Sequence, residues 1–266
     1  MSHNLIVSLI AIIFASVSHG WNYKEQDKWP GYCQNAIAQS PIDLDERSMI
    51  RIDMKPLMFK NWDIEYNATM TNNGHTVLVE LINKFPVSVS GGGLPGSYNL
   101  VQFHFHWGSE HTIEGNRKAL ESHFVTYNNR YKSLEEALKY RGGIAVLAVL
   151  YEESARQNDK FNPIVRSLQK IKKTKQKTEI KINPTKLLPR EFTRFYRYDG
   201  SLTTPDCNDV VVWTIFSELV PISKDQVKQF SSIRDAEGKM LSQNFRFIQP
   251  LNGRTVFEIY TDDVCC

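Results

Sequence analysis

The segment LVQFHFHW, residues 100–107, restricts the fold of this 266-residue chain more than any other feature. Its aromatic and β-branched residues favour a β-strand. Side chains two residues apart on a strand share a face. One face of this strand therefore carries three aromatic rings, and the other carries two imidazoles, His104 and His106. Such a strand is expected to lie between an apolar core and a site of polar chemistry.

Other segments indicate that this strand belongs to one large sheet. Six segments are predicted to be strands: 75–81, 100–107, 121–127, 144–151, 210–216 and 254–261. Three are predicted to be helices with their caps: 133–141 with a capping box of Ser133 and Glu136, 162–171 with Asn162 as cap and Pro163 at the first position, and 223–233 with Ser223 as cap. With no internal repeat or linker, we predict one mixed α/β, β-dominated domain.

The N-terminus predicts secretion. An apolar stretch, Leu5 to Phe14, is followed by small residues, as in a signal peptide. The alternative is an anchor helix, but the stretch is shorter than the about 20 residues that span a bilayer. We predict a signal peptide over 1–20, the folded domain over 21–262 and a cysteine-containing tail over 263–266. The net charge of +3 is too small to indicate nucleic acid binding.

The cysteines and one sequon fit an extracellular protein. Cys33, Cys207, Cys265 and Cys266 permit three pairings. Adjacent cysteines rarely bond each other without strain, and Cys33–Cys207 is the economical choice. One hypothesis for the tail is a disulfide-linked dimer through Cys265 or Cys266, and the alternative is a tail without a role. The sequon YNAT offers Asn67 as a glycosylation acceptor.

Five of the seven histidines lie between residues 75 and 123. In LESHFVTY, Glu121 and His123 share a strand face. If this strand neighbours 100–107, three imidazoles converge, and three imidazoles with an open position are the ligands of a catalytic zinc. Copper, nickel and iron also accept imidazole, but zinc is favoured with no thiolate or carboxylate nearby. Gln102 and Glu121 would each accept the second N–H of a ligand ring.

Blocks across nearly the whole mature chain resemble the α-class carbonic anhydrases of the secreted type. They are WNY at 21, QSPIDL at 39, NNGH at 72, QFHFHWGSEHT at 102, ESHFV at 121, AVLAV at 145, GSLTTP at 200, VVWTIF at 211 and NFRFIQPLNGR at 244. The resemblance implies a single domain with a mostly antiparallel central sheet of about ten strands and short peripheral helices. It also implies a conical site leading to zinc, and a Cys33–Cys207 disulfide.

The resemblance implies roles for individual residues. The metal ligands would be His104, His106 and His123, and their second N–H groups would bond to acceptors that include Gln102 and Glu121. Thr203 would accept a hydrogen bond from zinc-bound hydroxide and give its own proton to Glu110, and Thr204 would help to bind bicarbonate. The apolar wall for carbon dioxide would be Val125, Val146, Leu202 and Trp213; His75 would carry protons, Tyr23 would order water, and His111 would be structural.

The chain departs from the family pattern at two places that bear on the site. The segment WGS after His106 is short, which could tilt the strand that carries His123. Leu78 stands where highly active members carry a polar residue, which could slow proton transfer. We therefore predict a zinc lyase that interconverts carbon dioxide and bicarbonate. The alternatives are a related binding or matrix protein with little turnover, and a zinc hydrolase of esters or peptides, which lacks the expected His-Glu-x-x-His helix.

Overall fold

The computed structural model of the protein describes residues 20–261. The expected signal peptide, apart from Gly20, and the tail with Cys265 and Cys266 lie outside these residues. Within them, no helix is long and apolar enough to cross a membrane.

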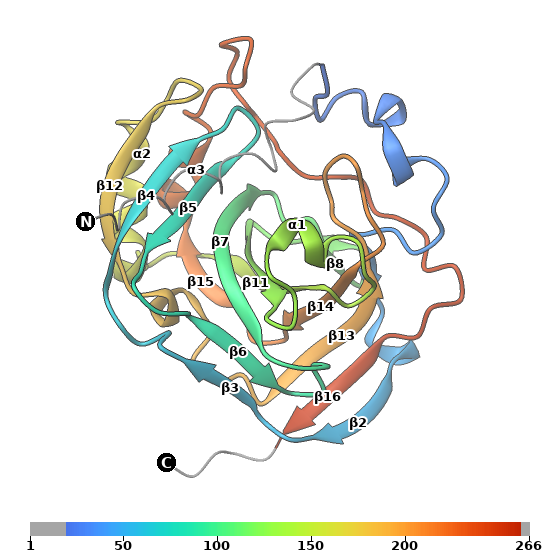
Figure 1. Ribbon diagram of the computed structural model, residues 1–266. Coiled ribbons are helices and arrows are strands. Elements are labelled where there is room, and N and C mark those ends of the chain that lie inside the picture. Colours follow the sequence, from blue (N-terminus) through green and yellow to red (C-terminus); the bar gives the residue numbers. More distant parts are fainter. Residues whose placement is uncertain (1–19, 262–266) are drawn as a thin grey trace, which may run out of the picture.

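A 13-stranded sheet forms the body of the molecule (Figure 1). Ten of its strands follow one another across the sheet in the order β12 (Lys177–Ile182), β4 (Tyr66–Asn72), β5 (Val77–Ile82), β7 (Tyr98–Trp107), β10 (Leu120–Asn128), β11 (Ile144–Ser154), β14 (Val211–Phe216), β13 (Arg194–Gly200), β16 (Phe257–Thr261) and β2 (Ile50–Met54). Most neighbours are antiparallel; β11–β14 and β16–β2 are parallel. The β-dominated fold and its large sheet were predicted correctly.

The remaining strands extend this sheet or form a small second one. Beside the main path lie β3 (Leu57–Lys60), β6 (Ser88–Gly91) and β15 (Val220–Ser223); a three-stranded sheet contains β1 (Asp43–Leu44), β8 (Thr112–Ile113) and β9 (Asn116–Arg117). Short 3₁₀ turns are η2 (Gln26–Lys28), η3 (Gly31–Cys33), η4 (Glu46–Ser48), η5 (Asp159–Phe161) and η6 (Pro184–Leu187). The first two precede β1, and the other three lie in connections between strands.

The three helices form where they were predicted but are shorter: α1 (Leu134–Ala137), α2 (Asn162–Leu168) and α3 (Lys224–Phe230). Ser223 caps α3 in a complete capping box with Gln226. The capping box predicted for α1 is half formed: Ser133 accepts from the N–H of Glu136, but the Glu136 carboxylate accepts from the N–H of Lys132 instead. The chain after α1 closes in tighter i→i+3 turns, which end the helix early.

The prediction that Asn162 caps α2 was wrong. Asn162 has helical backbone angles and is the first residue of the helix. A 3₁₀ turn, η5, leads directly into it, and the side chain of Asn158 caps that turn by accepting from the N–H of Lys160. The capping residue is therefore Asn158, about one turn before the position that Pro163 indicated.

The two faces of the central strands have different characters. Phe103, Phe105 and Phe124 are fully buried in the larger apolar cluster on one face of the sheet. The other face of the same strands carries the three predicted ligand histidines, beside a smaller apolar cluster that includes Val146 and Trp213. The alternation predicted for residues 100–107 is thus what positions the site.

Candidate metal centre

Strand pairing brings the three predicted ligands together. Strands β7 and β10 are antiparallel neighbours, with His104 directly opposite His123 and His106 opposite Glu121. Directly opposite residues have their Cβ atoms about 5 Å apart on one face. The rings follow this spacing: the centroids of His106 and His123 are 4.5 Å apart, and those of His104 and His123 are 5.2 Å apart.

Each ring has one nitrogen tied to an acceptor behind it. The Nδ1 of His104 lies 2.9 Å from Oε1 of Gln102, and the Nε2 of His123 lies 2.7 Å from Oε1 of Glu121. The Nδ1 of His106 lies 2.6 Å from the backbone carbonyl of Asn244. Because these oxygens can only accept, each ring must place its proton on that nitrogen. The lone pair of the other nitrogen is then available.

The three histidines lie close enough together to hold one metal ion. One ligand atom from each histidine can be chosen so that all lie within 4.8 Å of one another. The Nε2 of His106 is buried and has no hydrogen-bond partner among residues 20–261. Burial, and the nearby imidazoles, hold the pKa of His104 well below its usual value, and burial also lowers that of His106. Neutral imidazoles are the form that binds metal.

A second group, His111 with Glu121 and His123, is also close enough to hold a metal. Its atoms are already bonded to one another, however: Oε1 of Glu121 lies 2.7 Å from Nδ1 of His111 and 2.7 Å from Nε2 of His123. Burial alone would raise the pKa of Glu121, but the two imidazoles hold it well below its usual value. Both ring nitrogens of His111 are thus bonded, to Glu121 and to the hydroxyl of Tyr198, which fits the expected structural role; that role and the role of Glu121 as acceptor behind His123 stay predictions.

The histidines line a narrow hollow of about 50 Å³. Its lining is Trp21, Tyr23, Asn73, His75, Thr76, Leu78, His104, His106, His123, Val125, Val146, Leu202, Thr203, Thr204 and Trp213. The four residues expected to form an apolar wall and the two expected threonines are all among them. Leu78 lies directly opposite His104 on β5, so it adds an apolar side chain close to the ligands.

Glu110 is fully buried beside His106 and His123. Its Oε1 accepts from the backbone N–H of Arg246 at 2.7 Å, and its Oε2 lies 3.6 Å from Nε2 of His106. Among residues 20–261, Oε2 has no hydrogen-bond partner, so the expected bond from Thr203 is not formed in this structure. That bond stays a prediction, for which Oε2 is a free acceptor.

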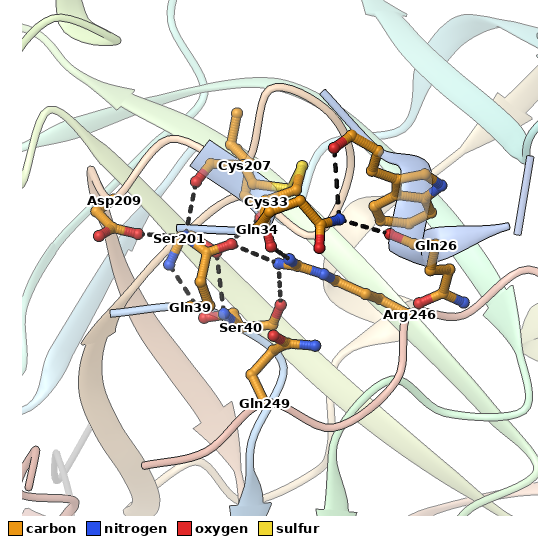
Figure 2. Close-up of a disulfide and its surroundings, with 12 residues drawn as sticks. Gln26, Cys33, Gln34, Gln39, Ser40, Ser201, Cys207, Asp209, Arg246 and Gln249 are labelled. Carbon is orange, nitrogen blue, oxygen red and sulfur yellow. Dashed lines mark hydrogen bonds between the residues drawn. A yellow bond between two sulfur atoms is a disulfide. The ribbon is translucent and has the colours of Figure 1, made fainter. Parts of the chain in front are cut away.

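The loop that carries Thr203 is tied to the N-terminal segment, as Figure 2 shows. The Cys33–Cys207 disulfide is present, which agrees with the expected pairing. The buried guanidinium of Arg246 donates to the carbonyl of Cys33 at 2.9 Å and to the carbonyl of Ser40 at 2.8 Å. Arg246 thus bonds to Glu110 through its backbone N–H and to the segment from Cys33 to Ser40 through its guanidinium.

His75 lies flat against Trp21, with ring centroids 3.8 Å apart and an interplanar angle of 8°. Burial lowers the pKa of His75 from 6.5 to about 4, against a smaller opposing effect of Asp235. The hydroxyl of Tyr23 is buried and has no partner among the described residues, and burial raises the pKa of Tyr23 well above its usual value. Both residues lie in the hollow, as expected.

The short WGS segment does not displace the site. Gly108, with φ of +70°, turns the chain after β7, and its N–H bonds to the carbonyl of Ala119 just before β10. Strands β7 and β10 pair in regular register from Trp107 opposite Leu120 to Gln102 opposite Val125. The expectation that the short loop could tilt His123 is therefore not supported by the register.

Two contributors were missed by sequence reasoning. The carbonyl of Asn244 is 138 residues away from His106 in the chain, and a backbone acceptor leaves no side-chain signal. Trp21 belongs to the WNY block, but nothing in that motif indicates that its ring stacks on His75. No residue spacing indicates either contact, because both depend on how distant segments meet.

Known proteins resemble the chain over most of its length. A family model described as eukaryotic-type carbonic anhydrase matches residues 21–260. "Putative carbonic anhydrase 5" of Caenorhabditis elegans is 36% identical, covering 96% of this chain and 88% of that protein. "Carbonic anhydrase 4" of Oryctolagus cuniculus is 37% identical over 87% of this chain and 79% of its own, and "Carbonic anhydrase 6" of Mus musculus is 34% identical over 94% and 85%. The chain therefore belongs to the eukaryotic-type carbonic anhydrase family of enzymes.

Proposed function

We propose that the protein binds zinc through His104, His106 and His123 and converts carbon dioxide reversibly into bicarbonate and a proton. One observation carries this proposal: each of the three rings is held by an acceptor on one nitrogen, and the three histidines offer one nitrogen each within 4.8 Å of one another. A set of three neutral nitrogen donors suits zinc and leaves an open coordination position for catalysis.

The metal and the surrounding residues have separate tasks. When bound, zinc supplies a strong nucleophile at neutral pH by lowering the pKa of its water to about 7, for which carbonic anhydrase is itself the reference case. Val125, Val146, Leu202 and Trp213 supply an apolar surface next to the ligands. Carbon dioxide has no net charge or dipole, so this wall can hold it without competing for the metal.

Thr203 would orient the attacking oxygen. A threonine hydroxyl has one proton, and Oε2 of Glu110 is a buried acceptor without a partner among residues 20–261. If Thr203 gives its proton to Glu110, it can only accept a hydrogen bond from the oxygen in the hollow. Thr204 beside it would bind the bicarbonate product. Replacement of Thr203 by alanine is then expected to slow turnover about 10- to 100-fold with the metal still bound.

His75 would move the proton from the hollow to solvent. A proton acceptor works best when its pKa is near the working pH, and burial lowers the pKa of His75 to about 4. We therefore propose that His75 accepts the proton when its ring has turned away from Trp21 into a more hydrated position. Tyr23 would help to order the water that connects His75 to the metal.

Secretion, glycosylation and the role of the tail also remain proposals. The Cys33–Cys207 disulfide favours an oxidising compartment. Asn67 is exposed on β4, where an oligosaccharide could be attached if the chain is secreted. A covalent dimer through Cys265 or Cys266 involves residues outside 20–261, and the disulfide that the structure contains lies within one chain.

The test is carbon dioxide hydration measured on one preparation in three states: as purified, after removal of metal with a chelator, and after readdition of zinc. We expect activity to disappear with the metal and to return in proportion to bound zinc. A protein that binds one zinc ion but does not accelerate hydration would contradict the enzymatic proposal and support the alternative of a binding protein. Activity that survives complete metal removal would exclude the zinc site.

A further inference from the structure

We propose that strand β2 is the interface of a reversible, two-fold symmetric homodimer, in which two copies of β2 pair antiparallel about Ile52 and join the two sheets. Strand β2, residues Ile50–Met54, is the last strand at one end of the main sheet and pairs only with β16 among residues 20–261. In Figure 1 it lies at the rim of the molecule, with no strand drawn beyond it.

The outward edge of β2 has unpaired backbone groups. The N–H of Ile50 bonds to the carbonyl of Val256, so the backbone groups of Ile50 point toward β16. Backbone groups of successive strand residues point to alternate sides. Those of Ile52 therefore also face β16, while those of Arg51 and Asp53 face outward. No hydrogen bond to the backbone N–H or C=O of Arg51 or Asp53 occurs outside the strand pairing among the described residues.

These outward groups match a second copy of the same strand. When two antiparallel copies are centred on Ile52, Arg51 of one copy lies opposite Asp53 of the other, and the reverse holds across the two-fold axis. Each of these pairs then consists of two residues whose N–H and C=O face one another, which is the hydrogen-bonded type of antiparallel pair. Centring the pairing on Arg51 or Asp53 would instead place like charges opposite each other, Arg51 against Arg51 or Asp53 against Asp53.

The side chains of β2 are complementary in the same register. Arg51 and Asp53 are both exposed, and neither forms an ion pair within residues 20–261. The guanidinium of Arg51 lies over the ring of Tyr260, 3.7 Å from its centroid, which holds it on the face it shares with Asp53. On the other face, Ile50 and Met54 are 52% and 37% exposed, and the register places Ile50 against Met54 of the second copy.

The opposite edge of the sheet is more strongly basic. Strand β12, Lys177–Ile182, is also unpaired on its outer side among the described residues. It follows the segment KIKKTKQ, and exposed Lys173, Lys175, Lys177 and Lys181 lie on or just before it. Two copies that met along this edge would bring lysines together, which is how many proteins prevent edge pairing. Exposed Glu179 lies among these lysines, so the two edges differ in charge balance: β2 carries one charge of each sign, whereas the β12 edge has an excess of lysines.

The pairing closes on itself and leaves the metal site open. A two-fold interface uses the same strand on both copies, so association stops at a dimer. Four other strands of the main path separate β2 from β10, so the hollow is not covered. The contact involves one short strand per copy, and such small interfaces are weak. We therefore expect a concentration-dependent dimer that salt weakens, because the charge pairs are exposed.

The test is sedimentation velocity over a concentration series at low salt. All variants carry Cys265→Ser and Cys266→Ser, so that no covalent bond through the tail contributes. Arg51→Asp sets two aspartates against each other on each side of the axis, and Asp53→Arg sets two arginines against each other. Each single change is expected to weaken dimerisation about tenfold or more. The double variant Arg51→Asp with Asp53→Arg restores opposite charges and is expected to recover the dimer.

Three controls make the outcome decisive. Lys177→Glu on the opposite edge should leave association unchanged, and the melting temperature of every variant shows whether the fold is intact. A protein that stays monomeric at all concentrations would overturn the proposal. So would a dimer whose dissociation constant is unchanged by both single substitutions. Failure of the double variant to recover association while it remains folded would also overturn it. A dimer that appears only when Cys265 and Cys266 are kept would mean that the tail, not β2, joins the copies.

Discussion

The two faces of β7 and β10 use the same backbone for opposite purposes. On one face, Phe103, Phe105 and Phe124 have no polar atom and are fully buried. On the other face, His104 and His123 lie opposite each other and are nearly as buried, but a specific hydrogen-bond acceptor holds each ring. The apolar face gains its stability from contact area, which is non-directional. The polar face depends on orientation, so the two faces should respond differently to substitution.

The largest expected effect is on the polar face. His123→Ala leaves two ligands, too few for a stable zinc site. We expect the variant to lose both bound zinc and hydration activity, as measured by metal analysis after dialysis and by a rate assay. The matched control is Phe124→Leu, the next residue on the opposite face, which should keep its zinc. A zinc-loaded, active His123→Ala variant would show that the ligand set is different.

The apolar face should affect stability instead. Phe105→Ala removes a fully buried ring and is expected to lower the free energy of unfolding by about 3–5 kcal/mol. Chemical denaturation should be measured with a chelator present, since bound metal would add to the stability. Phe247, which is 54% exposed, supplies the control: Phe247→Ala should change the free energy by less than about 0.5 kcal/mol. Equal effects of the two changes would remove the contrast between the faces.

A smaller effect is expected behind the ligands. Glu121→Gln keeps the shape of the side chain but removes the charge that holds both His111 and His123. Loss of such a supporting group typically costs about 10- to 100-fold in metal affinity. Competition with a fluorescent chelator measures the zinc affinity, and Glu179→Gln on the exposed edge strand is the control. Unchanged affinity in Glu121→Gln would mean that the ring of His123 is held by packing alone.

The smallest expected effect is a pH dependence at the mouth of the hollow. The folded-state pKa of His75 is lowered from 6.5 to about 4, so between these values the unfolded chain binds the extra proton. Stability should therefore fall as pH decreases through this window, and His75→Gln should flatten the slope. Trp21→Leu should raise the pKa of His75 toward 6.5 in an NMR titration. An unaltered pKa in that variant would assign the shift to other neighbours.

Sequence patterns predicted the central strands well, because dense β-branched and aromatic residues with period-two alternation leave few other structures for 100–107, 121–127 or 144–151. Two polar strands were not predicted: YNATMTN forms β4 and IRIDM forms β2, although neither is strongly apolar. They are strands because their neighbours supply hydrogen bonds, which is a property of the sheet rather than of the segment. The helix ends were misjudged because 3₁₀ turns adjoin α1 and α2.

The site was predictable as far as strand periodicity and family motifs reach. The ligands and two of their acceptors lie on two strands, so spacing indicates which side chains share a face. The stacking of Trp21 on His75, the Asn244 carbonyl and the free oxygen of Glu110 depend on how segments far apart in the sequence come together. Such contacts have no local sequence pattern and arise only in the folded protein.

The bond from His106 to Asn244 also has a consequence for the order of events during synthesis. All three imidazoles lie in the first half of the chain, but the carbonyl that fixes the proton of His106 is in the last tenth. A growing chain that ends before Asn244 therefore has its ligands without the acceptor that orients one of them. Contacts of such long sequence separation form late. Metal should consequently be captured tightly only after translation of the C-terminal segment, and a ribosome-stalled chain would be expected to release it readily.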